Sequence, residues 1–247
     1  MVTTWTRTTL TPADWLIDAA EPDDPAIAAR VGHALEHGPG FTVVRGLPVA
    51  DHGDPIPRRF ARLLGVPRPE PTGLVTDLSG RGEPRRGMDT GPLALHTDRA
   101  GPPRPPRLLA LRCVRAAAAG GDSVLANGHT VHARLRTSHP GLVEELYQDF
   151  HFGTGRVYPV FTRDRRVHYN RHWIERGNQA TGRPFSARTR AALDAFDAAL
   201  ADPGLTVELR LRPGDLLILD NTSILHGRTA FTDDPDNPRC LLRQWLD

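Results

Sequence analysis

Short segments with the pattern of β-strands, separated by turn residues, recur along most of this 247-residue chain and limit the folds open to it. Leu205 to Leu211 alternates apolar and polar residues strictly, as a strand with one buried face does. Leu216 to Leu219 is wholly apolar, and Pro213-Gly214 between the two segments is a turn signal. Further strands are expected at 41–49, 93–98, 108–114, 123–126, 226–231 and 240–246. This many short strands indicate a β-sandwich or jelly roll.

Helical spacing is confined to a few segments. Ala26 to Leu35 places Ile27, Val31 and Leu35 on one face, and Ser186 to Ala201 begins at a residue suited to an N-cap. Shorter helices are expected near 58–64, 131–137 and 141–147. The expected fold is therefore mainly β with flanking helices, in a single domain that spans residues 1–247. Segments 67–92 and 153–168 are weakly patterned, and we interpret both as candidate lids.

Composition excludes several classes of function. All 31 basic residues are arginine and are scattered among 29 acidic residues, which argues against a nucleic-acid partner. The absence of lysine excludes Schiff-base chemistry on this chain. No apolar run is long enough to span a bilayer, and Met1 to Thr11 lacks the features of a signal peptide, so we expect a cytoplasmic protein. Only Cys113 and Cys240 are present, too few for a disulfide framework.

The motif with the clearest chemistry is His96-Thr97-Asp98, which follows the strand-like run Leu93 to Leu95. Residues two apart in a strand point to the same side, so the imidazole and the carboxylate can bind one ion together. A second histidine would complete a two-histidine, one-carboxylate triad, which is typical of Fe(II) oxygenases. The spacing alone is weak, because 11 histidines and 29 acids give about one chance match, and His52-Gly53-Asp54 is such a match in a polar turn.

Several histidines could supply the third ligand. His226 follows the apolar pair Ile224-Leu225 and is the first choice, while His151 competes because it also lies in a strand-like segment. His168 and His172 could line the pocket instead. His129, His132 and His139 lie in or beside predicted helices and are poorer candidates. Spacing by itself leaves the choice between His226 and His151 open.

Six ordered pieces of the sequence resemble one known family. They are Gly40–Leu47, Leu95–Asp98, Gly120–Ser123, Pro213–Asn221, His226–Arg228 and Arg239–Trp245. Together they are similar to the taurine dioxygenase and clavaminate synthase-like (TauD/TfdA) group of Fe(II)- and 2-oxoglutarate-dependent oxygenases. The resemblance covers most of the chain, from about Phe41 to Asp247.

The resemblance implies a double-stranded β-helix, a jelly roll with a cupin-like core, that uses Fe(II), 2-oxoglutarate and O2. It implies His96, Asp98 and His226 as metal ligands and catalytic residues. It also implies that Arg239 binds the distal carboxylate of 2-oxoglutarate, a role that suits a planar guanidinium, with Ser123 as a supporting hydroxyl. Because related halogenases lack a carboxylate at the position of Asp98, hydroxylation, desaturation or another oxidation is expected here.

The substrate is expected to be a small molecule, anionic or amino-acid-like, because three arginines could line a cationic pocket: Arg243, Arg156 and Arg171. An arginine-rich, lysine-free composition typical of a GC-rich genome, taken with the resemblance, favours secondary metabolism. Two alternatives stay open. One is a cupin-like metalloenzyme that uses no 2-oxoglutarate, and the other is a non-catalytic jelly-roll binding protein. No sequence pattern indicates the oligomeric state.

Overall fold

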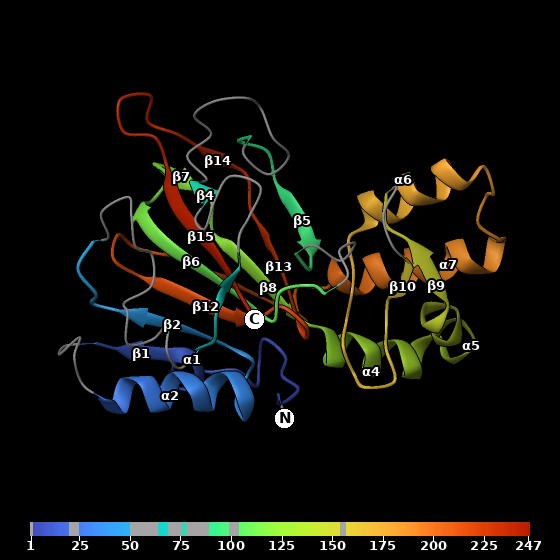
Figure 1. Cartoon of the computed structure of the whole chain (residues 1–247), viewed down its shortest axis with the longest axis horizontal. Helices are drawn as coiled ribbons and strands as arrows, with labels where there is room; N and C mark the ends of the chain where they lie inside the picture. Colours follow the sequence, from blue (N-terminus) through green and yellow to red (C-terminus); the bar gives the residue numbers. More distant parts are fainter. Residues whose placement is uncertain are drawn as a thin grey trace.

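The computed structural model describes residues 2–19, 25–49, 64–68, 76–77, 89–98, 104–153 and 157–247. Its core is a pair of facing β-sheets (Figure 1). The large sheet has the order β1 (Leu16–Asp18), β2 (Phe41–Arg45), β12 (Leu216–Asp220), β6 (Leu108–Arg115), β15 (Cys240–Leu246) and β3 (Pro67–Arg68), and β4 (Thr76–Asp77) also pairs with β15. The small sheet has the order β11 (Thr206–Leu209), β8 (Ser123–Asn127), β13 (Ile224–Arg228) and β5 (Leu93–His96). Two-stranded pairs are formed by β9 (Asp149–His151) with β10 (Val157–Pro159), and by β7 (Ala119–Gly120) with β14 (Phe231–Thr232).

Alternation along the strands explains how the layers form. In β12, Leu217 and Leu219 face the small sheet and join the core between the sheets, which also contains Leu125 of β8. The intervening Leu216 and Ile218 face the other way and pack under helix α2 (Pro25–Glu36). A wholly apolar strand therefore has both faces buried, as its sequence pattern suggests.

A helical layer covers the outer face of the small sheet. It contains α4 (Gly128–Ser138), α5 (Pro140–Val143), the 3-10 helix η1 (Glu144–Tyr147), α6 (Arg171–Thr181) and α7 (Ala187–Leu200), which gather on one side of the molecule (Figure 1). Leu225 of β13 and Ala126 of β8 pack into this layer, so alternate residues of β13 face opposite cores. The short helix α1 (Pro12–Trp15) lies near the start of the chain.

Most predicted elements are confirmed, with ends that shift by a few residues. The Ser186 hydroxyl accepts a hydrogen bond from the Thr189 amide at 2.9 Å, as the predicted N-cap of α7 requires. Helix α6 was not predicted, since only Ile174 and Gly177 of its residues are buried and no apolar stripe marks it. Gly177 is required there because a Cβ atom would lie 2.0 Å from the His151 carbonyl oxygen.

Other predictions fall largely outside the described residues. These include the helix at 58–64, the His52-Gly53-Asp54 match and much of the segment 67–92. The described parts of that segment include β3 and β4, both paired with β15. In the segment 153–168, β10 pairs with β9 and Phe161 bridges to Val167. The lid role of both segments stays a prediction.

The described residues contain neither a membrane-spanning helix nor a disulfide. No helix there is long and apolar enough to cross a membrane. Cys113 and Cys240 are both buried, and they form no disulfide with each other.

Candidate metal centre

The His96-Thr97-Asp98 motif and His226 meet at one end of the small sheet. His96 is the last residue of β5, and His226 is the central residue of the neighbouring strand β13. The two strands are antiparallel, and His226 lies directly opposite His96 in their register. Cross-strand neighbours project to the same face of a sheet, so both imidazoles face the interior between the sheets.

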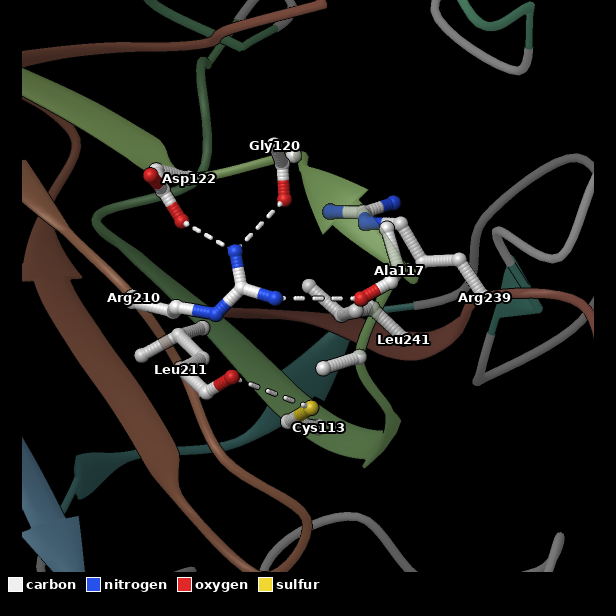
Figure 2. Close-up of a pocket in the computed structure, with 10 residues that line it drawn as sticks. Cys113, Ala117, Gly120, Asp122, Arg210, Leu211, Arg239 and Leu241 are labelled. Atoms are coloured by element: carbon white, nitrogen blue, oxygen red, sulfur yellow. Dashed lines mark hydrogen bonds and ion pairs between the residues drawn. The ribbon is translucent and has the colours of Figure 1, made fainter. Parts of the chain in front are cut away.

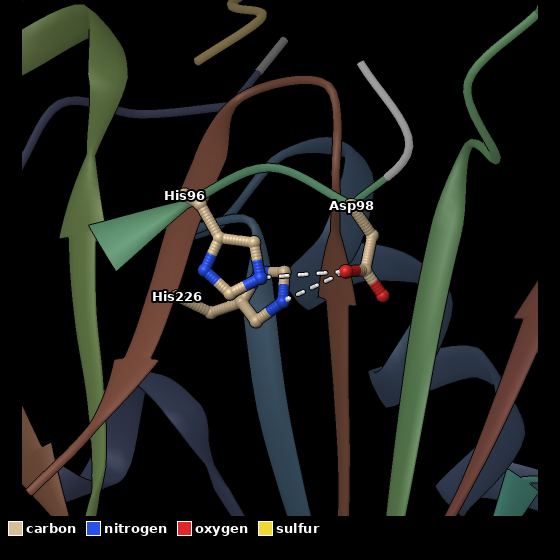
Figure 3. A group of neighbouring side chains, drawn as sticks. All are labelled: His96, Asp98 and His226. Atoms are coloured by element: carbon tan, nitrogen blue, oxygen red, sulfur yellow. Dashed lines mark ion pairs between the residues drawn. The ribbon is translucent and has the colours of Figure 1, made fainter. Parts of the chain in front are cut away.

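The three side chains present a compact set of donor atoms (Figure 3). One ligand atom from each of His96, Asp98 and His226 lies within 4.8 Å of the others. Asp98 Oδ1 is 3.4 Å from His96 Nε2 and 3.8 Å from His226 Nε2. Among the described residues this is the one group of at least three such side chains, and His151 lies outside it. Two nitrogens and one oxygen on one side of a point match the facial triad of non-haem iron sites.

The histidine rings are oriented to offer Nε2. His96 Nδ1 lies 2.9 Å from the carbonyl oxygen of Ala94, and because a carbonyl can only accept, Nδ1 carries the proton. The Nε2 lone pair of His96 then points toward Asp98 and His226. His226 Nδ1 is buried and has no hydrogen-bond partner, so its ring is held by packing on the β13 strand.

Charges around the triad favour the protonation states that a metal requires. Burial alone would raise the pKa of the Asp98 carboxyl, but the Arg243 charge and contacts with His96 and His226 hold that pKa well below its ordinary value. Burial, followed by the proximity of His96, lowers the pKa of His226 to about 3. An ionised carboxylate beside a neutral imidazole is the form in which these groups bind metal ions.

Asn221 holds the main chain of Asp98, a role that spacing did not reveal. The Asn221 side-chain oxygen accepts from the Asp98 amide at 2.7 Å, and its NH2 group donates to the Asp98 carbonyl at 3.1 Å and to that of Pro106 at 2.9 Å. Asn221 is buried, five residues before His226. In the sequence, Asn221 ends the motif Pro213–Asn221, directly after an apolar strand, and this position is the one signal of its role.

The other oxygen of Asp98 is occupied. Oδ2 accepts a hydrogen bond from the indole Nε1 of Trp245 at 2.7 Å and another from Arg243 Nη1 at 3.2 Å. Both donors come from β15, where residues 243 and 245 share a face. Oδ1 is therefore the oxygen that faces the two imidazoles.

Arg239, the predicted 2-oxoglutarate anchor, is a buried cation just before β15. Its guanidinium lies over the Phe231 ring, with 5.3 Å from Cζ to the ring centroid, and makes no ion pair or hydrogen bond with any described residue. Burial, and next the charge of Arg228, lower the pKa of Arg239 to about 10. A buried charge without a partner is costly, so this position suits an anionic ligand.

Gly120, Gly121 and Arg239 line one small pocket, which Figure 2 shows in close-up. Arg210 donates to the carbonyls of Gly120 and Ala117 and pairs with Asp122, whereas no interaction line reaches Arg239 (Figure 2). Gly121 has φ +74°, and a Cβ atom there would lie 3.3 Å from Arg239 Nε. The glycine pair thus allows the guanidinium to lie close against the backbone.

Ser123, the predicted supporting hydroxyl, faces the same interior. It is buried at the start of β8 and lies opposite Arg228, while Leu125, two residues on, lies opposite His226. Ser123 therefore lies on the inner face of the small sheet, two residues along β8 from the position opposite His226. Its hydroxyl makes no hydrogen bond to another described residue, so it is available to a ligand.

The three predicted substrate arginines have different surroundings. Arg243 contacts Asp98 directly and stacks on Trp245 with 4.7 Å from Cζ to the ring centroid. Arg171 donates to Glu175, Asp194 and Asp197, at 2.9, 2.8 and 2.6 Å, and so connects α6 with α7. Arg156 lies outside the described residues.

A surface depression of about 610 Å3 borders the centre on the side of the helical layer. β5, including His96, forms one wall, and Asn170, Arg171 and His172 at the start of α6 form another. His168, also considered as a pocket residue, is buried, and its ring lies 5.1 Å from that of Tyr158. Arg171 therefore shares this depression with His96, but its charge is already balanced by carboxylates.

The family model described as taurine catabolism dioxygenase TauD, TfdA family, matches residues 7–245. A uridine-5'-phosphate dioxygenase from a Streptomyces species is 36% identical over 146 residues, which cover 54% of this chain and 53% of that protein. FR-33289 synthase from Streptomyces rubellomurinus is 24% identical over 252 residues, which cover 90% of this chain and 73% of the relative. The alignments with the two uridine-5'-phosphate dioxygenases thus span only about half of those relatives.

Solved structures share the fold. Asparagine oxygenase superposes with a TM-score of 0.70 at 21% identity, covering 94% of this chain and 93% of that one. The non-haem iron oxygenase OrfP in complex with Fe and α-ketoglutaric acid superposes with a TM-score of 0.63 at 21% identity, covering 91% and 83%. These matches confirm the predicted jelly-roll core with flanking helices.

Proposed function

The chain belongs to the TauD/TfdA dioxygenase family, and from that premise we propose that it is an Fe(II)- and 2-oxoglutarate-dependent dioxygenase acting on a small metabolite. The observation that carries the proposal is the triad itself. His96, Asp98 and His226 present two imidazole nitrogens and one carboxylate oxygen within 4.8 Å of each other, at one end of the small sheet. In this role the three residues hold Fe(II) and leave one side of it open to ligands.

The remaining residues of the centre fit a keto-dicarboxylate. Arg239 provides a buried guanidinium without a counter-ion among the described residues, and the Ser123 hydroxyl on the inner face can donate to the same carboxylate. The pair would anchor the distal carboxylate and so direct the keto-acid end toward the triad. When bound, iron with 2-oxoglutarate and O2 supplies the oxidising power for the substrate, and the protein supplies binding and orientation. A cupin-like enzyme without a keto acid would have no use for Arg239.

For the substrate, we propose a small anionic or amino-acid-like metabolite or a nucleotide, in secondary metabolism. The names of the relatives support this class, since one acts on uridine 5'-phosphate and structural neighbours include an asparagine oxygenase. Arg243 is the candidate for the anionic group of the substrate, because it lies at the triad and its side chain is 23% exposed. Arg171 is a weaker candidate, and Arg156 stays a candidate from the sequence alone.

The test is anaerobic addition of Fe(II) and 2-oxoglutarate to the purified protein. Chelation of the keto acid at the triad should produce a weak visible metal-to-ligand charge-transfer band. Arg239→Gln should shift the half-saturating 2-oxoglutarate concentration upward by about 10- to 100-fold, because hydrogen bonds to charged groups contribute about 1.5–3 kcal/mol. Arg212→Gln, at an exposed arginine, is the matched control and should behave as wild type.

Absence of the band although iron is bound would refute the use of 2-oxoglutarate. Absence of iron binding would refute the metal centre. With the band established, small phosphorylated and amino-acid-like metabolites can be screened for a shift of its position, which reports substrate binding beside the iron.

A further inference from the structure

The two oxygens of the Asp98 carboxylate have different hydrogen-bond partners. Oδ2 receives two donors, the Trp245 indole at 2.7 Å and Arg243 Nη1 at 3.2 Å, whereas Oδ1 faces His96 Nε2 and His226 Nε2. A carboxylate can bind a metal ion through one oxygen or through both. With Oδ2 already bonded twice, Oδ1 is the oxygen left for a metal.

We propose that Trp245 is a positioning residue that keeps Asp98 a one-oxygen ligand. This inference rests on the proposed function, since it requires that the triad binds a metal. If Oδ2 also bound, it would occupy one of the positions that the keto acid, dioxygen or water must use. By retaining Oδ2, the indole keeps the open side of the triad available.

Trp245 is better suited to this task than Arg243. Its side chain is 3% exposed and its backbone pairs with Leu109 inside the large sheet, so the ring is fixed by packing. The Arg243 side chain is 23% exposed, and its guanidinium lies over the Trp245 ring at 4.7 Å. The indole therefore both donates to Asp98 and supports the second donor. Partners of metal-binding carboxylates typically change metal affinity by about 10- to 100-fold when removed.

The test compares two tryptophan variants of the full chain. Trp245→Phe keeps an aromatic ring under Arg243 but removes the N–H donor. The matched control is Trp5→Phe, which removes an equally buried indole donor from the same core, where Trp5 Nε1 donates to the Pro39 carbonyl at 2.8 Å. Zn(II) and Co(II) affinities are measured by competition with a chelator, and the visible spectrum of the Co(II) form reports the coordination of the ion.

Trp245→Phe should alter the Co(II) spectrum, because Oδ2 is then free to bind the ion as well, and should change the Zn(II) affinity by about 10- to 100-fold, while Trp5→Phe should match wild type in both. Equal metal binding by all three proteins, or equal changes in both variants, would overturn the positioning role. His226→Ala tests the proposed function separately. If this variant binds metal as tightly as wild type, both the proposed function and this inference are overturned.

A measurement on wild-type protein guards against misfolding of the variant. In protein labelled with 15N, the indole N–H signal of Trp245 should move when Zn(II) is added, because its acceptor becomes a metal ligand. The signal of Trp5 should stay in place. An unmoved Trp245 signal in protein saturated with Zn(II) would overturn the proposal.

Discussion

Two clusters of charged side chains lie on either side of β5. They differ in whether each charged group has a partner of opposite charge within the protein. In the helical layer, Arg171 donates to three carboxylates, those of Glu175, Asp194 and Asp197. In the metal centre, Asp98 Oδ1 faces two imidazoles, and Arg239 has no counter-ion among the described residues. The charge of Arg171 is thus matched by carboxylates of the protein, whereas the second cluster is a candidate site for a metal ion and an anion.

The same contrast appears in the two guanidinium groups. Burial lowers the pKa of each, but the carboxylates around Arg171 outweigh it and raise that pKa above its ordinary value. Nothing comparable offsets burial at Arg239, and its pKa falls to about 10. An arginine with its charge matched connects two helices, whereas a buried arginine without a matched charge is a candidate site for an anion.

The largest expected effect is the loss of a triad side chain. His226→Ala should lower Fe(II)-dependent succinate formation by more than about 100-fold, since changes to groups that merely support a metal ligand already cost 10- to 100-fold. His151→Ala, at an exposed histidine of β9, should retain wild-type turnover. Succinate release and bound iron measure the effect. Near-normal turnover in His226→Ala would place the metal elsewhere.

Next in size is Asn221→Asp. The substitution replaces the NH2 donor by a carboxylate oxygen facing the carbonyls of Asp98 and Pro106, which should lower the free energy of unfolding by about 2–3 kcal/mol and weaken metal binding. Asn170→Asp is the control, because Asn170 caps α6 by accepting from the Trp173 amide, which aspartate also does. Urea unfolding measures both variants. Equal stability of the two would show that the Asn221 bonds do not hold Asp98.

A smaller effect is expected for Arg239→Lys. Lysine keeps the positive charge but loses the planar fork, so KM for 2-oxoglutarate should rise about 10-fold, with little change in Zn(II) affinity. Initial rates at varied 2-oxoglutarate concentration provide the measurement, and Arg212→Lys is the matched control. An unchanged KM would mean that the distal carboxylate binds at another residue.

The smallest effect on metal and 2-oxoglutarate binding is expected from the cluster around Arg171. Arg171→Gln removes three partly exposed ion pairs and should lower the free energy of unfolding by about 1 kcal/mol while leaving metal affinity and KM for 2-oxoglutarate unchanged. Arg190→Gln, at an exposed arginine with one longer ion pair, is the control and should change stability less. A specific loss of primary-substrate binding in Arg171→Gln would show that this cluster also belongs to the substrate site.

Prediction from sequence succeeded where side-chain periodicity is set by the backbone alone. The strict alternation before Pro213 and the apolar run after it became β11 and β12, and Ser186 capped α7. It missed α6, whose exposed surface carries no apolar stripe and whose position depends on contact with β9. It also gave no role to Asn221 and Trp245, because both act on Asp98 across more than 100 residues of chain.

The amino-acid sequence by itself indicated that His96 and Asp98 could bind one ion together, from their two-residue spacing after a strand-like run, although β5 ends at His96 and Asp98 lies just beyond it. It also determined the mainly β class and the order of the family's motifs. Strand spacing left the choice between His226 and His151 open, and the tertiary structure brings His226 to the motif through antiparallel pairing of β13 with β5 while His151 lies exposed on β9. Only the tertiary structure likewise showed that Arg171 is ion-paired and that Arg239 has no counter-ion among the described residues. The reason is that ion pairing depends on which carboxylates the fold brings near each guanidinium.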